Sequence, residues 1–144
     1  MPRALLALLL LTGAAQAAEP LTIDVHRDPN CGCCSAWIEH LQHNGFLVND
    51  HLEADMPALK QRLGVPPSLA SCHTGVIDGK FVEGHVPAAD ILTLRQRPDL
   101  LGAAVPGMPT GSPGMERGNV RDAYQVIGVD KQGQATVITQ YPGN

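Results

Sequence analysis

The residues of this chain best suited to chemistry are its four cysteines, three of which fall within four consecutive positions. Cys31, Cys33 and Cys34 form a C-x-C-C motif, and Cys72 follows later in the chain. Cys31 and Cys34 have the C-x-x-C spacing of disulfide oxidoreductases, whereas Cys33 departs from that pattern. Thiolates both bind metal ions and attack disulfides, so the motif indicates either a metal site or a redox site.

The elements that position this motif can be predicted from the spacing of apolar residues. Residues 21–26 alternate apolar and polar side chains, which predicts a strand, and the helical spacing over 33–44 predicts a helix that stops at Gly45. The motif therefore lies where a strand turns into the N-terminus of a helix. Unpaired N–H groups and the positive end of the helix dipole stabilise thiolates at such a position.

Further along the chain, strands and helices are predicted to alternate. A second strand opens at residues 46–48, and a short helix begins near Pro57 and ends before Gly64. Two strands flank the Asp-Gly pair at residues 78–79, which is the strongest short hairpin signal. A third helix is predicted over 88–97.

This order, β-α-β-α-β-β-α, is that of the thioredoxin fold, and we therefore predict an α/β, thioredoxin-like fold. In that fold the loop before the third strand packs against the C-x-x-C turn. Residues 71–74 form that loop here, so all four sulfurs are expected to converge on one site. A loop rich in proline and glycine over 105–118, and a hairpin over 124–129 and 135–141, are predicted additions at the C-terminal end.

The first residues have the pattern of a secretory signal peptide. A basic residue is followed by an apolar run over 4–11 and by the small-x-small motif Ala15-Gln16-Ala17. We interpret residues 1–17 as a signal peptide and residues 18–144 as a single domain. Export to the bacterial periplasm would place the cysteines in an oxidising compartment, and no second hydrophobic stretch is long enough for a membrane anchor.

Composition argues against two classes of protein. The formal net charge is −4 and no basic run occurs, which makes nucleic acid a poor partner. The hydrophobic fraction is 44% and the charged fraction is 17%, which argues against intrinsic disorder.

Because only five residues are aromatic, the core must consist mainly of aliphatic side chains.

Three interpretations of the cysteines compete. Two structural disulfides are usual in an exported domain, but adjacent Cys33 and Cys34 are strained partners and the crowded motif cross-links little of the chain. Disulfide exchange through Cys31 and Cys34 is the second interpretation, although Cys72-His73 occupies the place of the cis-proline expected in a thioredoxin fold. A thiolate metal site is the third, and we favour it.

Copper fits such a site better than zinc does. Zinc sites more often use paired C-x-x-C knuckles, and a single zinc ion shared by Cys31, Cys33 and Cys34 would be cramped. Bridging thiolates that hold several Cu(I) ions tolerate this crowding, and soft sulfur ligands select Cu(I). Met108 and Met115 add thioether sulfurs to the same set of soft donors.

Four stretches of the sequence resemble one known family. They read CGCCSAW (31–37), GVPPSLASCHT (64–74), EGHVPAADI (83–91), and VPGM with GSPGME (105–108 and 111–116). They are similar to the periplasmic copper-resistance proteins of the CopG type, a family with an uncharacterised domain, over nearly the whole of residues 18–144. The resemblance implies a thioredoxin-like fold, a role in copper resistance, and copper binding through Cys31, Cys33, Cys34 and Cys72.

Five other residues are candidates for a metal or redox role beside the cysteines: His26, His73, His85, Met108 and Met115. His26 ends the first strand close to the motif. His73 follows Cys72, but its side chain is expected to point the other way in an extended segment. His85 is expected to support the site rather than to bind metal. The two methionines would either pass Cu(I) to the thiolates or belong to a loop that covers them.

The sequence thus predicts a periplasmic protein that holds Cu(I) in a cluster of several ions and sequesters copper or interconverts Cu(I) and Cu(II). Such interconversion would make it a copper oxidoreductase, and whether it is an enzyme stays open. Two alternatives remain: a disulfide oxidoreductase that maintains the thiols of other periplasmic copper proteins, and a copper carrier that docks on an efflux pump.

Overall fold

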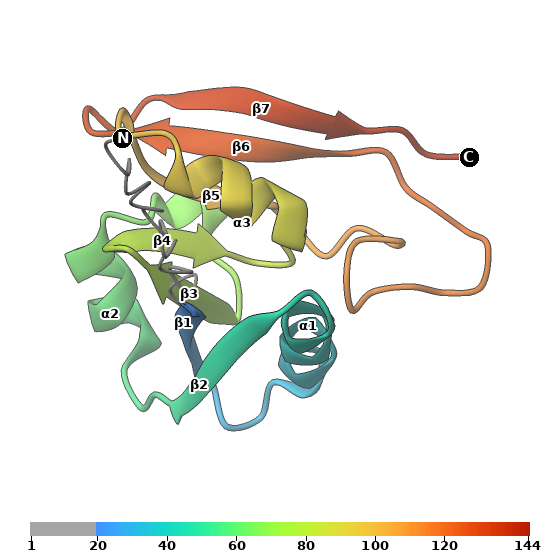
Figure 1. The fold of residues 1–144 in the computed structure, drawn as a ribbon, viewed down its shortest axis with the longest axis horizontal. Helices are drawn as coiled ribbons and strands as arrows, with labels where there is room; N and C mark the ends of the chain where they lie inside the picture. The colour runs from blue at the N-terminus through green and yellow to red at the C-terminus, as the bar shows by residue number, and fades with distance from the viewer. Residues whose placement is uncertain (1–19) are drawn as a thin grey trace, which may run out of the picture.

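The computed structural model describes residues 20–144, so the predicted signal peptide lies outside the described residues. The chain forms one mixed sheet in the order β2-β1-β3-β4-β5-β6-β7, with helices on both faces (Figure 1). The strands are β1 (Leu21–Arg27), β2 (Phe46–Leu52), β3 (His73–Ile77), β4 (Lys80–Glu83), β5 (Leu100–Ala104), β6 (Tyr124–Asp130) and β7 (Ala135–Tyr141). The helices are α1 (Gly32–His43), α2 (Met56–Leu63) and α3 (Ala88–Arg95), with a short 3-10 segment, η1 (Pro67–Leu69).

The predicted α/β, thioredoxin-like order is confirmed from β1 to α3, and so is the added hairpin β6–β7. One strand, β5, was not predicted. Its sequence, Leu-Leu-Gly-Ala-Ala, is poor in β-branched and aromatic residues and is almost entirely buried, so it shows neither strand propensity nor alternation. β5 pairs in parallel with β4 and antiparallel with β6, and therefore joins the hairpin to the rest of the sheet.

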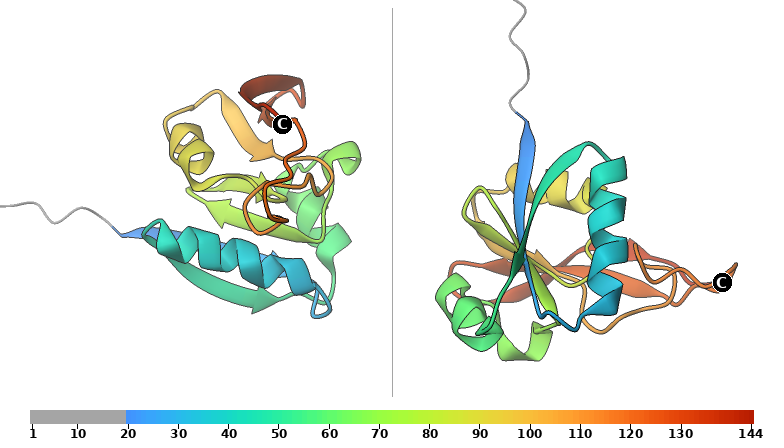
Figure 2. Two further views of the ribbon diagram at one scale, coloured as in Figure 1. Left: turned by 90° about the vertical axis from the view of Figure 1, so that its right-hand side faces the viewer. Right: turned by 90° about the horizontal axis from the view of Figure 1, so that it is seen from below.

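The larger part of the core lies between the sheet and the helices α1 and α3, which share one face (Figure 2). Trp37 of α1 is fully buried there and packs over β3 at Gly75, where a Cβ would stand 3.2 Å from the indole ring. A smaller cluster built on Val65, Phe81 and Val129 fills the opposite face beside α2. Aliphatic side chains supply most of both clusters, in agreement with the composition.

The loop between β5 and β6 is irregular, as predicted, and lies against α1 (Figure 1). Gly114 has a φ of +84°, and a Cβ at this position would stand 2.8 Å from the backbone nitrogen of Trp37. Glycine is therefore required for both its conformation and its lack of a side chain. In the described part of the chain, no helix is long and apolar enough to cross a membrane.

Candidate metal centre

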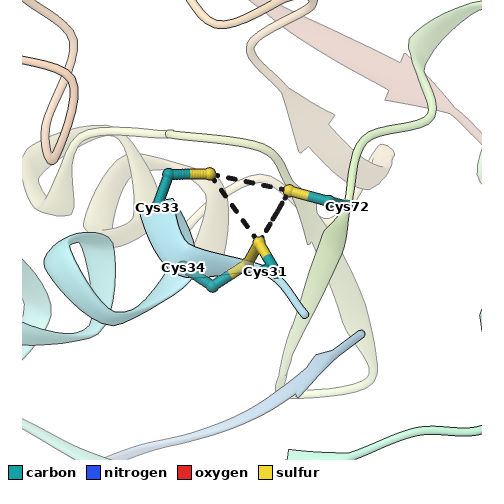
Figure 3. A group of neighbouring side chains, drawn as sticks. All are labelled: Cys31, Cys33, Cys34 and Cys72. Carbon is teal, nitrogen blue, oxygen red and sulfur yellow. Dashed lines mark hydrogen bonds between the residues drawn. A yellow bond between two sulfur atoms is a disulfide. The ribbon is translucent and has the colours of Figure 1, made fainter. Parts of the chain in front are cut away.

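The structure brings the four cysteines together, as expected. Their sulfur atoms all lie within 4.8 Å of one another (Figure 3). Cys31 is the N-cap of α1, Cys33 and Cys34 are in its first turn, and Cys72 approaches from the loop before β3. Two segments that are far apart in the sequence therefore share one group of sulfur atoms.

Strand pairing explains why these two segments meet. β1 and β3 are antiparallel, and Arg27 at the end of β1 is paired with His73 at the start of β3. The next residue of the first segment, Asp28, donates its backbone N–H to the carbonyl oxygen of Cys72 at 3.4 Å. Asp28 also forms the turn into α1, because its carbonyl oxygen accepts the N–H of Cys31 at 3.1 Å. Register and turn together fix Cys72 beside the C-x-C-C motif.

Two of the four cysteines are joined and two are free. Cys31 and Cys34 form a disulfide, whereas Cys33 and Cys72 are thiols. The sulfur of Cys72 lies 2.9 Å from that of Cys31, 3.7 Å from that of Cys34 and 3.8 Å from that of Cys33. The structure therefore does not contain two structural disulfides, and its single disulfide closes so short a loop that it restricts the unfolded chain little.

The N-terminus of α1 faces the sulfur atoms with its backbone N–H groups uncapped by side chains. The first turn of α1 contains no acidic residue, and no side chain caps its N–H groups. The positive end of the helix dipole therefore points at the sulfur atoms without an acidic side chain to offset it. On the other side, burial raises the pKa of the Cys72 thiol to about 11, and the neighbouring Cys33 adds to the shift. A soft cation that binds Cys72 must therefore displace a proton.

His73 lies against the site, and the expectation that its side chain would point away was wrong. Its Nδ1 is 3.2 Å from the sulfur of Cys34, while its Nε2 donates to the carbonyl oxygen of Gly84 at 2.8 Å. Cys34 is buried more deeply than Cys31 and Cys33, and its sulfur therefore meets the buried ring of His73. Because a carbonyl oxygen only accepts, Nε2 carries the proton and neutral Nδ1 presents a lone pair to Cys34.

The other candidate residues differ in how close they come to the cysteines. The thioether sulfur of Met108 lies 3.8 Å from the sulfur of Cys33, and its side chain is 55% exposed. His85 stands edge-on to His73 and donates from Nδ1 to the carbonyl oxygen of Pro113, which ties it to the β5–β6 loop. Its buried Nε2 has no hydrogen-bond partner among the described residues.

Met115 and His26 make other contacts in the structure. The carbonyl oxygen of Met115 accepts a backbone hydrogen bond from Gly111 within the β5–β6 loop. The ring of His26 stacks on His51 of the adjacent strand, and its Nδ1 lies 3.7 Å from a carboxylate oxygen of Glu53. These contacts place His26 in a polar group on β1 and β2 rather than among the sulfurs.

A groove of about 930 Å³ opens beside Cys31 and Cys72. Its walls are mostly apolar and come from α2 and the segment that follows it, including Met56, Val65 and Pro67. Cys34, which is fully buried, does not line the groove. An incoming thiol or metal ion that enters here therefore meets Cys31 and Cys72 first.

Sequence reasoning missed a group of largely buried polar residues next to Cys72. Glu83, Lys60, Ser71 and Thr74 are linked by hydrogen bonds, and Glu83 is fully buried. Glu83 opens the stretch EGHVPAADI, but a charged residue after an apolar pair such as Phe81-Val82 is common at strand ends and did not mark it as buried. A buried carboxylate needs such partners, because an unpaired buried charge is strongly destabilising.

We expect the free energy of unfolding to fall as the pH drops from about 7 to about 5, because the folded state keeps His73 neutral. Burial, with a smaller contribution from His85, lowers the pKa of His73 from 6.5 to about 3. The stabilisation is complete above the unfolded pKa and decreases as the pH falls, by up to about 1.4 kcal/mol per pH unit for one proton. Denaturant unfolding across this range measures the slope.

The variant His73→Gln provides the control for this pH dependence. The pKa values of His26, His40 and His85 are also lowered by burial, so part of the slope should remain in the variant. An identical slope in the variant and in the natural protein would contradict the assignment to His73.

Comparisons with known proteins agree on one group of relatives. Residues 69–115 match the family model described as "Protein of unknown function, DUF411". A solved structure named copper resistance protein CopG, form 1, is 73% identical, covers 87% of this chain and 100% of its own, and has a TM-score of 0.85. Form 2 of a copper resistance protein CopG is 72% identical, covers 86% of this chain and 100% of its own, and has a TM-score of 0.84. No curated protein sequence matches.

Proposed function

The chain belongs to the family of the copper resistance protein CopG, and from this we propose that it binds several Cu(I) ions through Cys31, Cys33, Cys34 and Cys72. A role in copper resistance follows from the family together with a cysteine group that can hold metal. The observation that carries the proposal is the convergence of four sulfurs from two separate segments within 4.8 Å.

The donor set supports copper over the common alternatives. Four cysteine sulfurs and the nearby thioether of Met108 are soft ligands, which select Cu(I). Cys72 is close to all three other sulfurs and is therefore well placed to bridge ions. The carboxylate and carbonyl oxygens preferred by magnesium and calcium are not among the atoms of this group.

The disulfide between Cys31 and Cys34 supports a redox step in the same site. When the two thiols lose their protons and transfer one electron each to two Cu(II) ions, they form the disulfide and two Cu(I) ions. Reduction by an external dithiol reverses the change in the cysteines, and the dithiol becomes a disulfide. The protein would then reduce Cu(II) to Cu(I) at the expense of the dithiol, as well as hold the Cu(I) that forms.

The cellular setting is part of the proposal. Residues 1–17 would act as a signal peptide that directs residues 18–144, as one domain, to the periplasm. Copper ions would be the ligand, and other periplasmic copper-handling or efflux proteins would be the partners. The exposed side chain of Met108 at the edge of the site would be the donor surface for such a transfer.

One alternative function has its own supporting observation. The Cys31–Cys34 disulfide at a helix N-terminus, beside a groove lined by Cys31, also suits a disulfide oxidoreductase. A metal-free sample that catalyses the reduction of insulin by a dithiol would support this alternative. We expect no such catalysis above the rate of the dithiol alone.

Titration of the reduced protein with Cu(I), without oxygen, tests the proposed function. We expect more than one ion per chain, bound in a single cooperative phase against a chromophoric Cu(I) chelator. A titration that saturates at one ion per chain would contradict the cluster of several ions. A protein that binds no Cu(I) would contradict the proposed function as a whole.

A further inference from the structure

A single buried carboxylate holds the loop that carries Cys72. Glu83, at the end of β4, is fully buried. It accepts hydrogen bonds from the backbone N–H of Ser71 at 2.6 Å, from the Ser71 hydroxyl at 2.8 Å and from the Thr74 hydroxyl at 2.6 Å. Ser71 and Thr74 are the residues on either side of Cys72-His73. One side chain therefore fixes both ends of the segment that enters the cysteine site.

Lys60 of α2 completes this arrangement. Its ammonium group forms an ion pair with Glu83 and donates to the Thr74 hydroxyl at 2.7 Å. The Lys60 side chain is largely buried and lines the groove beside Cys72. The positive charge offsets the cost of burying the carboxylate, so the pair can persist inside the fold.

The backbone of this loop needs such support. Among the described residues there is no cis peptide bond, so the segment before β3 is not shaped by a cis-proline. Ser71 and Cys72 lie just before β3, where the backbone hydrogen bond from Asp28 to the carbonyl oxygen of Cys72 is long, at 3.4 Å. The hydrogen bonds to Glu83 therefore add to the strand register in orienting Cys72.

We propose that Glu83, paired with Lys60, is the positioning residue that sets where the sulfur of Cys72 stands relative to the sulfurs of α1. This inference rests on the proposed binding of Cu(I) by the cysteines. Glu83 contacts Ser71 and Thr74, and it acts through the backbone between them. Loss of its charge releases the loop, and Cys72 no longer meets the other three cysteines in one geometry.

Asp90 offers a matched control for a purely structural effect. Asp90 is also buried and also accepts two hydroxyl hydrogen bonds, from Tyr141 at 2.6 Å and from Thr139. These bonds join α3 to β7 and involve no cysteine. A change at Asp90 therefore tests what the loss of a buried carboxylate does to the fold without disturbing the Cys72 loop.

The test compares Glu83→Gln with Asp90→Asn in the reduced full chain, using Cu(I) alone as the probe and competition with a chelator as the readout. We expect Glu83→Gln to weaken Cu(I) binding by about 10- to 100-fold, the range usual for residues that orient metal ligands. Asp90→Asn should lower the free energy of unfolding but change Cu(I) binding less than about twofold.

A double-mutant comparison shows whether Glu83 acts through Cys72. In a Cys72→Ser background, Glu83→Gln should change the remaining Cu(I) affinity less than about twofold, because the residue it positions is already gone. An equal loss in both backgrounds would overturn the inference. If Glu83→Gln does not fold, Ser71→Ala removes the hydroxyl that lies 2.8 Å from both Glu83 and the carbonyl oxygen of His73, and should weaken binding in the same direction by a smaller factor.

The outcomes also separate this inference from the proposed function. A natural protein that binds no Cu(I) overturns both. A natural protein that binds Cu(I) through Cys72, with unchanged binding in folded Glu83→Gln and in Ser71→Ala, overturns the role of Glu83 alone.

Discussion

Replacing Cys72 with serine should reduce the capacity of the reduced protein from several Cu(I) ions to at most one. The three cysteines of α1 come from one turn, and Cys72 is the partner from a second segment, with its sulfur 2.9 to 3.8 Å from the other three. Replacing Cys72 removes the sulfur that is best placed to bridge two Cu(I) ions. We expect the apparent affinity to fall more than about 100-fold, beyond the usual cost of losing a residue that only orients a ligand.

The control for this prediction is Met108→Leu, which keeps the volume of an exposed side chain and removes a thioether 3.8 Å from Cys33. Its effect on Cu(I) affinity should stay below about tenfold. Copper per chain and chelator competition measure both variants. If Cys72→Ser binds as many ions as the natural protein, the shared use of Cys72 is wrong.

Oxidation should reduce copper loading from several Cu(I) ions to at most one, which is the second large effect we expect. The disulfide between Cys31 and Cys34 leaves only Cys33 and Cys72 as thiols, 3.8 Å apart. A disulfide offers no thiolate, so the oxidised protein has half of the donor set and should hold at most one Cu(I) ion. Reduction without oxygen, followed by removal of the reductant, should restore the full capacity. Thiol counts and copper counts on the same samples measure the change.

The double variant Cys31→Ser/Cys34→Ser is the matched control. It keeps the same two thiols as the oxidised protein but cannot form the disulfide. Its copper capacity should therefore be low and should not change with reduction. Equal capacity of the natural protein before and after reduction would show that the disulfide does not control loading.

Much of the arrangement around α1 could be predicted from local sequence signals. The alternation over residues 21–26 and the helical spacing after the motif placed the C-x-C-C cysteines at a helix N-terminus, as observed. The convergence with Cys72 followed from the fold class, because β3 lies beside β1 in that topology. β5 was not predicted because Gly102, Ala103 and Ala104 have little strand propensity. The strand forms because it pairs with β4 on one side and β6 on the other.

The details that depend on long-range packing could not be predicted in this way. The position of His73 beside Cys34 depends on how closely the first turn of α1 packs against β3. No local sequence pattern predicts this packing. The ion pair of Glu83 with Lys60 joins residues on β4 and α2, and no local sequence pattern pairs these two positions. The choice of Cys34 rather than Cys33 as the disulfide partner of Cys31 is consistent with C-x-x-C spacing, but the sequence left it open.

X-ray absorption at the copper edge, on the reduced natural protein loaded with Cu(I), tests the central claim most directly. We expect a first shell made mainly of sulfur together with a short copper–copper scattering path, because the four sulfurs are close enough to be shared between ions. A shell of nitrogen or oxygen ligands, or a sulfur shell with no copper–copper path at full loading, would contradict a thiolate cluster formed by Cys31, Cys33, Cys34 and Cys72.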